Sequence, residues 1–393
     1  MAIVADLNAL VSEGVLTRAQ ADILRGRSRA AMIAMVIHTL LAGGVLAAAG
    51  GLIVLLGAPV PVALAGLAFL VLGVLVLVAG GDLWRMFGHA AALIGAGMLI
   101  GGGVTEAVDS LTEASAGMLF LAVGLLIAGV CGLAHRFGPL SMRFLTGFLL
   151  VAGVALHLAG LYMLGIAQDA GGFWRVMANL YTTVALIALG WYLDTRLLTA
   201  LAIVPFAQML DTSTAYFHAA YVFYSPEPTF SILQMALAVA IAVALMQARP
   251  ERDGRHAGIF AIMAFIVGNL CFLVGSLWGD VPGQSLLMTS VFDRYPDDWQ
   301  ARNAAIDVFT RTAVHIPDYV FAITWAALLA ACAIWAAHTL RRGLFNAAMT
   351  FGAIHAYTQA FESFGDEPMA WVIGGLAAIP LAWGIWRLNE QFR

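Results

Sequence analysis

Chemically active side chains gather in one apolar stretch, residues 205–218, where a helix is expected to cross a bilayer. Gln208, Asp211 and His218 are three and seven residues apart, so on a helix they would share one face. An aspartate at the centre of a membrane helix costs roughly 2.5–3.5 kcal/mol, so it usually faces a polar partner or a water-filled cavity. The stretch therefore predicts a proton, cation or solute pathway, or else a neutral acid with a structural role.

A second polar stripe follows near the end of the chain, with His355, Gln359 and Glu362 at helical spacing. If the two helices face each other, Gln208 and Asp211 would meet His355 and Gln359 in a polar seam. Such an acid and imidazole could exchange a proton near neutral pH. Neither stripe has the three convergent ligands of a zinc site, and no hydrolase, nucleotide or dinucleotide motif is present. We therefore expect no metal, no cofactor and no enzymatic activity.

Composition sets the class of protein. Of 393 residues, 62% are hydrophobic and 11% are charged, and the mean hydropathy is +0.91. Soluble domains carry about 25% charged residues, so the deficit predicts an all-α integral membrane protein whose main partner is the lipid bilayer. The net charge of −4 is too small to favour a nucleic-acid partner.

Twelve apolar runs are long enough to cross a hydrocarbon core of roughly 30 Å. They lie near residues 31–56, 60–79, 89–105, 114–133, 144–164, 174–193, 197–221, 229–247, 257–278, 319–339, 344–363 and 369–388. With both termini cytoplasmic, all but four of the 19 basic residues fall on the inner side. That bias predicts a multi-pass protein of the bacterial inner membrane.

Two segments lie outside the predicted membrane domain, 30–393. Residues 1–29 are expected to form a cytoplasmic helical hairpin, with a break at Gly14 and a capping box from Thr17 to Gln20. The hairpin is either a solvated leader or a docking module for a protein partner. Residues 279–318 form the longest outer loop, and residues 299–312 within it have a helical pattern, either a lid or a plain surface helix.

Spacing of glycines suggests internal repeats. Spans one, five and nine each carry two glycines seven residues apart, at 43 and 50, 153 and 160, and 268 and 275. Four spans per unit would give three parallel repeats, at 30–134, 143–248 and 256–389. In that arrangement Asp211 and Glu362 would occupy equivalent places.

Both ends of the chain resemble known sequences. The leader, residues 7–21, and the segment Phe351–Glu362 with Trp386–Asn389 resemble a widespread group of predicted bacterial polytopic membrane proteins of unknown function with a short N-terminal helical hairpin. The resemblance implies an inner-membrane protein and supplies no catalytic residues.

Two functions fit these observations. The first is movement of a small solute or ion, with proton coupling, through a pathway containing Asp211, Gln208, His218, His355, Gln359 and Glu362. The second is a non-transporting membrane scaffold or sensor that docks a partner through residues 1–29.

Overall fold

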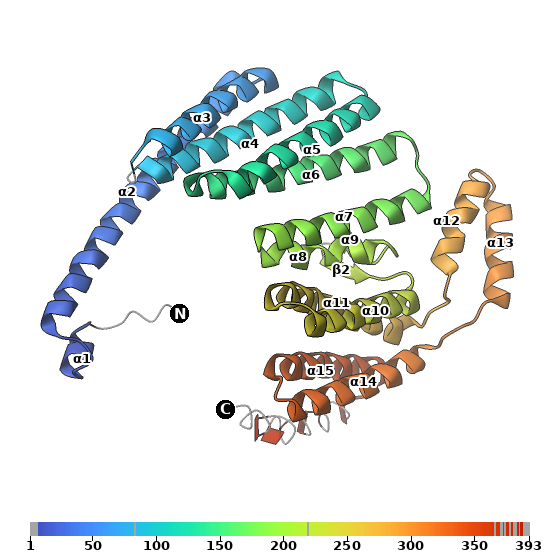
Figure 1. Ribbon diagram of the computed structural model, residues 1–393. Helices are drawn as coiled ribbons and strands as arrows, with labels where there is room; N and C mark the ends of the chain where they lie inside the picture. Colours follow the sequence, from blue (N-terminus) through green and yellow to red (C-terminus); the bar gives the residue numbers. More distant parts are fainter. Residues whose placement is uncertain are drawn as a thin grey trace. The chain divides into compact units, whose positions relative to one another are not determined.

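The computed structural model describes residues 7–81, 84–217 and 220–364, together with scattered residues between 367 and 387. The described chain is almost entirely helical, and it forms two compact units that divide between Asp169 and Ala170 (Figure 1). Unit 1 contains α1 (Leu7–Ser12), α2 (Arg18–Leu56), α3 (Pro59–Ala79), α4 (Arg85–Ser110), α5 (Glu113–Phe137), a 3₁₀ turn (Leu140–Met142) and α6 (Arg143–Ala167). Unit 2 contains α7 (Gly172–Leu193), α8 (Arg196–Leu201), α9 (Ile203–Gln208), β1 (Ser213–Phe217), β2 (Ala220–Tyr224), α10 (Pro228–Ala248), α11 (Glu251–Trp278), α12 (Gln284–Arg294), α13 (Trp299–Thr312), α14 (Asp318–His338) and α15 (Arg342–Phe364).

Nine helical segments of the described chain are long and apolar enough to cross a membrane. The all-α membrane class predicted from composition is thus supported, whereas the count of twelve is not reached. The predicted span 197–221 is broken, and the span 344–363 forms a helix, α15, that is less apolar than the nine. The last predicted span, 369–388, lies largely outside the described residues.

The N-terminal capping box is confirmed, but the helix that it starts is longer than predicted. Gly14 turns the chain with a φ of 75°, and the Thr17 backbone N–H donates to Gln20 Oε1 over 2.9 Å. The Gln20 backbone N–H donates in return to the Thr17 hydroxyl over 3.3 Å. From there α2 continues for 39 residues to Leu56. The second hairpin helix and the first span are therefore one helix.

Glycines bring the backbones of neighbouring helices into contact in unit 1. A Cβ atom added to Gly66 of α3 would lie 2.7 Å from the Gly95 carbonyl oxygen of α4. Gly124 of α5 and Gly153 of α6 face each other in the same way, with a Cβ on Gly124 at 2.7 Å from the Gly153 oxygen. Without a hydrophobic driving force in lipid, such small-residue contacts supply the dispersion energy that pairs the helices.

These contacts do not follow the predicted repeat. Gly153 touches another backbone, whereas Gly43 and Gly50 have no described atom within 4 Å of an added Cβ, and Gly275 faces the ring of Phe321. The third element of each proposed repeat also differs, because residues 89–105 lie in one continuous helix and residues 197–221 do not. The three glycine pairs thus have unlike environments.

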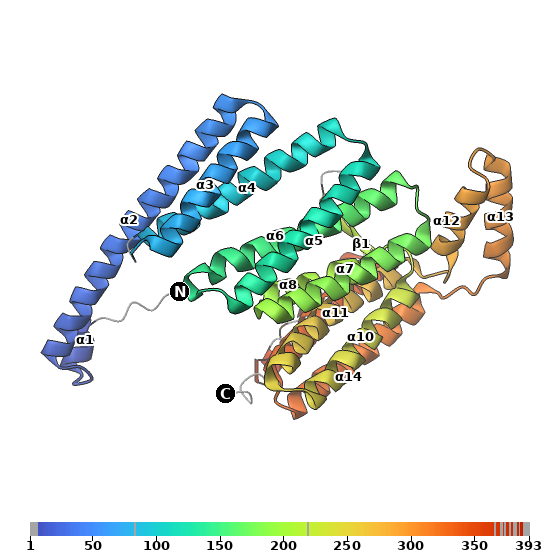
Figure 2. The same ribbon diagram turned by 45° about the horizontal axis from the view of Figure 1, so that its top comes forward.

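Two cores of unit 2 share helix α11. Ile203 and Ala207 of α9 pack with α10 and with Ala264 of α11, while Trp325 of α14 and Phe351 of α15 pack on another part of α11. Figures 1 and 2 both show α11 between α8 on one side and α14 on the other. Helix α11 is therefore the central helix of this unit.

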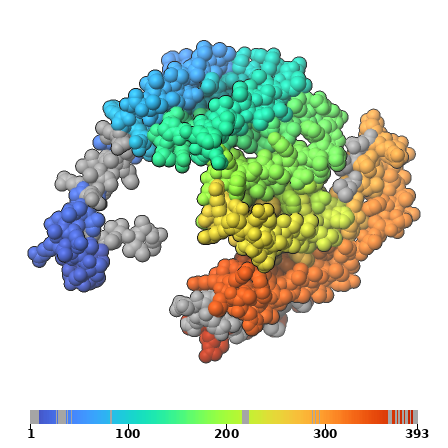
Figure 3. Space-filling view, in the orientation of Figure 1, coloured from blue at the N-terminus to red at the C-terminus, as the bar shows by residue number. Residues whose placement is uncertain are grey.

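The excursion between α11 and α14, residues 279–317, contains a helical hairpin. Helix α13 matches the predicted segment 299–312, and α12 was not predicted. Two backbone hydrogen bonds of 2.9 Å between Asp280 and Ile316 close the base of the excursion. In the space-filling view α12 and α13 form the orange rim of unit 2 (Figure 3).

The glycine packing of unit 1 predicts a position-specific effect of alanine. Gly95→Ala would bring Cβ into collision with the Leu70 backbone nitrogen, so α3 and α4 must separate. We expect a loss of about 1–3 kcal/mol of stability, read as a lower melting temperature in detergent. Gly97→Ala is the matched control, because Gly97 lies on the same helix with no described atom within 4 Å of an added Cβ. Equal melting temperatures of the two variants would contradict the close packing.

Candidate functional site

The predicted membrane helix 197–221 is a discontinuous element. Helix α8 ends at Leu201, α9 ends at Gln208, and an antiparallel hairpin pairs Ser213–Phe217 with Ala220–Tyr224. Pro205 has no N–H to give to the carbonyl of Leu201, which explains the break between α8 and α9. Asp211 then adopts a φ of 57°, a left-handed conformation that aspartate tolerates better than most residues.

The predicted shared face of Gln208, Asp211 and His218 is therefore wrong, because the helix ends at Gln208. His218 lies outside the described residues. The Asp211 carboxylate instead accepts a hydrogen bond of 3.2 Å from the guanidinium of Arg175, in the first turn of α7. Both side chains are about half exposed, with 43% of Asp211 and 51% of Arg175 accessible.

The part of the chain from Asp194 to Asp211 runs back along the whole length of α7. It starts at Asp194, which follows the last turn of α7, and reaches Asp211, which pairs with the first turn. Asn179 of α7 donates to the Gln208 carbonyl over 3.3 Å, and Gln234 of α10 donates to the Phe206 carbonyl over 2.8 Å. Each carbonyl also accepts a backbone N–H bond, from Met209 or Asp211, so the two amides add a second donor at the interrupted end of the helix.

At the α8 end of the element, a polar network connects it to α11. The ring of His256, which is 4% exposed, lies 2.7 Å from the Thr199 hydroxyl and 3.0 Å from the Asp194 carboxylate. Arg255 donates to the same carboxylate over 3.2 Å. The hydrogen bond from His256, helped by the charge of Arg255, lowers the pKa of Asp194. Because Thr199 is buried, the network holds the fold and presents no accessible nucleophile.

The second predicted stripe lies on α15 and packs on another part of the unit. The His355 ring meets Trp325 edge-on at 4.8 Å between centroids, and the Trp325 indole donates to Asn269 over 2.8 Å. His355 Nδ1 and Gln359 Nε2 are buried without a hydrogen-bond partner among the described residues. Glu362 is exposed. Asp211 pairs with Arg175 of α7 and His355 packs on Trp325 of α14, so the described contacts do not form the predicted seam.

Three buried hydroxyls meet where the discontinuous element rejoins α10. Thr212 follows Asp211, Ser225 follows β2, and Ser231 lies in the first turn of α10. The Thr212 oxygen is 2.7 Å from that of Ser231 and 3.1 Å from that of Ser225, and all three side chains are at most 3% exposed. The cluster satisfies its own hydrogen bonds and places polar atoms inside an otherwise apolar layer.

A buried carboxylate, Glu227, adjoins this cluster and caps helix α12. It is 1% exposed and accepts hydrogen bonds from the backbone N–H groups of Gly283 and Ser285, over 2.7 and 2.8 Å. The Ser285 hydroxyl adds a third bond of 2.6 Å. These donors form the N-terminus of α12, where a negative charge is stabilised by the helix dipole.

Asp280 caps helix α10 in a reciprocal way. Its carboxylate accepts a hydrogen bond of 2.9 Å from the Thr229 backbone N–H, in the first turn of α10. Burial raises the pKa of Asp280, and the nearby charge of Glu227 adds to the rise, while the bonds from Thr229 oppose it. Among the described residues, neither carboxylate has a basic side chain within ion-pair distance.

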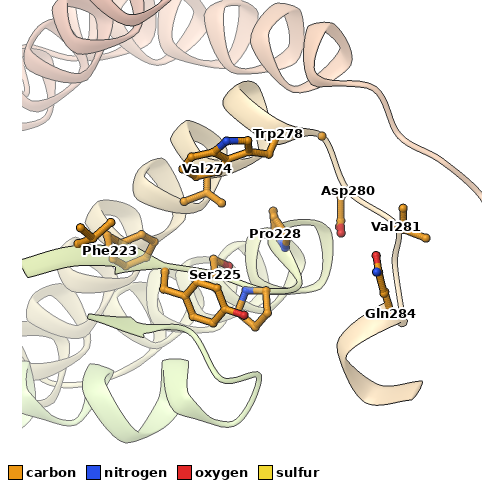
Figure 4. Close-up of a pocket in the computed structure, with 12 residues that line it drawn as sticks. Phe223, Ser225, Pro228, Val274, Trp278, Asp280, Val281 and Gln284 are labelled. Atoms are coloured by element: carbon orange, nitrogen blue, oxygen red, sulfur yellow. The ribbon is translucent and has the colours of Figure 1, made fainter. Parts of the chain in front are cut away.

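A cavity of about 430 Å³ opens beside these groups. Its lining includes Phe223 and Tyr224 of β2, Trp278 at the end of α11, Asp280 and Gln284. Figure 4 shows Phe223 on one side of the space and the polar ends of Asp280 and Gln284 on the other. Within the described chain, no group of three or more His, Cys, Asp or Glu side chains is arranged to hold a metal ion.

Sequence reasoning missed most of this site. The sequence patterns do not single out Glu227, Thr212, Ser225, Ser231 or Asp280. The sequence Glu227-Pro228 does carry a signal, because proline favours the first position of a helix and an acid favours its start. Nothing local indicates that Glu227 caps a helix more than fifty residues away.

Comparison with known proteins adds no assignment. No family model, no curated protein and no solved structure matches this chain. The resemblance to predicted bacterial membrane proteins stays a prediction.

The three-donor contact predicts that Glu227 is essential for the excursion. Glu227→Gln keeps the volume but puts an amide NH₂ against backbone donors, so at least one buried donor loses its acceptor. We expect a loss of about 1–3 kcal/mol and faster backbone hydrogen exchange in α12. Glu362→Gln makes the same chemical change at an exposed position and should melt with the wild type. Unchanged exchange in α12 would refute the capping role.

The raised pKa of Asp280 predicts a stability that increases on mild acidification. The folded protein binds this proton more tightly than the unfolded chain, so Asp280 adds stability as the pH falls towards its unfolded pKa of about 4. Asp280→Asn keeps an acceptor for Thr229 and removes the titration. We expect the variant to be at least as stable as the wild type at pH 7.5 and to lack the gain at pH 5.

Melting temperatures at both pH values measure this difference. Asp307→Asn, an exposed change on α13, should follow the wild type. An Asp280→Asn variant that gains as much stability on acidification as the wild type would show that Asp280 is not the source of the gain.

Proposed function

We propose that this chain is a multi-pass protein of the bacterial inner membrane that moves a small solute or ion, coupled to protons, with the pathway in unit 2. The observation that carries the proposal is the discontinuous element, to whose backbone carbonyls Asn179 of α7 and Gln234 of α10 add side-chain hydrogen bonds. Interrupted helices at membrane depth are typical of transporters, where they bind the substrate near the interruption. A scaffold has no need for such an element.

The cavity and the hydroxyl cluster support a route through this region. Ser225 lines the cavity and also belongs to the cluster with Thr212 and Ser231, so polar atoms continue from the outer cavity into the helix layer. In this proposal the Arg175–Asp211 pair controls the outer end of the discontinuous element. His355, Gln359 and Glu362 form a second polar stripe of the proposed pathway, to which His218 also belongs.

Topology follows from the same proposal. The chain crosses the membrane twelve times with both termini cytoplasmic, and residues 196–208 form a short seventh crossing. At 1.5 Å per residue the element is about 20 Å long, shorter than the hydrocarbon layer of roughly 30 Å. Residues 209–212 complete the crossing, because Asp211 reaches the first turn of α7. The parallel four-helix repeats are not part of this proposal, because the glycine environments differ.

Asp211→Asn tests the pathway in proteoliposomes. The pair with Arg175 is exposed and worth about 0–1 kcal/mol, so the variant should fold normally. Under an imposed potential, we expect the proton flux of the variant to be about one tenth of the wild-type flux, as measured with an internal pH-sensitive dye. Asp109→Asn, an exposed acid of unit 1, is the matched control and should retain the wild-type flux.

Two outcomes would contradict the proposal. Wild-type flux equal to that of protein-free liposomes, for protons and for monovalent cations, would favour the scaffold or sensor. An Asp211→Asn variant with full flux would remove Asp211 from the pathway.

A further inference from the structure

We propose that the cavity beside Asp280 is a binding site for a small organic cation with an ammonium group. This inference rests on the proposed function and names the class of its substrate. The cavity lies at the outer end of unit 2, between β2, the end of α11 and the start of α12. The inference combines three observations: the local charge, the nature of the walls and the size of the space.

The local charge is negative and has no basic partner among the described residues. Asp280 lines the cavity and is 9% exposed, and Glu227 is 1% exposed next to it. All the hydrogen bonds that the two carboxylates receive come from neutral donors, and no described basic side chain pairs with either. Burying two like charges is unfavourable unless a cation offsets them. An anion is therefore excluded from this space.

The walls favour an organic cation over a metal ion. Phe223, Tyr224 and Trp278 present aromatic rings, and Val274 and Pro228 add apolar surface. A calcium ion requires six to eight oxygen ligands, which this lining does not supply. Ring faces attract ammonium groups, most strongly when several aromatic residues surround the cation. Trp278 is 71% exposed and Tyr224 53%, so the aromatic rim is accessible from outside.

The size of the space suits a small molecule. A volume of about 430 Å³ lies in the range of small-ligand sites, roughly 300–1,000 Å³. The side-chain amide of Gln284 and the hydroxyl of Ser225 also line the cavity and could orient a polar group of the ligand. An alkylammonium with a hydroxyl or amide group would use all of these contacts.

Choline is the probe for this site. Isothermal titration of the full chain in maltoside detergent should detect choline binding, and the neutral isostere 3,3-dimethyl-1-butanol should bind at least tenfold more weakly. Asp280→Asn should weaken choline binding about tenfold or more, since it removes the charge while keeping an acceptor for Thr229. Trp278→Leu, at an exposed rim position, should weaken it about three- to fivefold. Asp307→Asn is the control and should bind as the wild type does.

A second arm distinguishes a free amine from a lipid headgroup. Dihexanoyl phosphatidylcholine, below its micellar concentration, carries the same ammonium group beside a phosphate. Tighter, Asp280-dependent binding of the lipid would assign the site to a headgroup, and preference for choline would assign it to a free amine. Either result supports the ammonium site. No binding of either probe, or equal binding to the wild type and Asp280→Asn, would overturn it.

Flux measurements separate this inference from the proposed function. Choline binding without any flux in proteoliposomes would uphold the ammonium site and reject transport. Proton or cation flux without choline binding would uphold transport and reject the ammonium site.

Discussion

The structure of unit 2 depends on one constraint, which is that backbone carbonyls in an apolar layer must find donors within the protein. The interruption between α8 and β1 leaves the carbonyls of Phe206 and Gln208 outside a regular helix. Each accepts one backbone N–H bond in the turn that follows, from Met209 or Asp211, and Gln234 and Asn179 add a second donor from the two flanking helices. Their amides therefore anchor the end of α9 to both helices, which explains why polar residues appear in these otherwise apolar helices.

The end of unit 2 beside the excursion depends on two carboxylates that each cap a helix from another part of the chain. Glu227 precedes α10 and caps α12, whereas Asp280 follows α11 and caps α10. This exchange fixes the start of α10 against the base of the excursion, which the Asp280–Ile316 backbone bonds close. The same arrangement leaves negative charge without a basic partner next to an aromatic cavity. The carboxylates that cap these helices are thus the same groups that would attract the proposed ammonium ligand.

The two units use different means of holding helices together. In unit 1, glycines allow α3 to touch α4 and α5 to touch α6 along their backbones, so these pairs need few polar side chains. In unit 2, polar networks at Asp194 and Asp280 hold a chain that is not continuously helical. Backbone contacts at glycine thus hold the helix pairs of unit 1, and side-chain hydrogen bonds hold the interrupted chain of unit 2.

From the sequence alone, the membrane class, most helix bounds, the capping box at Thr17 and helix 299–312 could be predicted, because hydropathy and capping act over a few residues. The importance of the stretch around Asp211 was also visible as polarity in an apolar run. Its geometry was not, since Pro205 allows either a kinked helix or a full break, and the side-chain contacts from α7 and α10 exist only in the tertiary structure. The pairing of Glu227 with α12 and of Asp280 with α10 likewise required the tertiary structure. These contacts join residues 51 or more positions apart, and no local pattern specifies them.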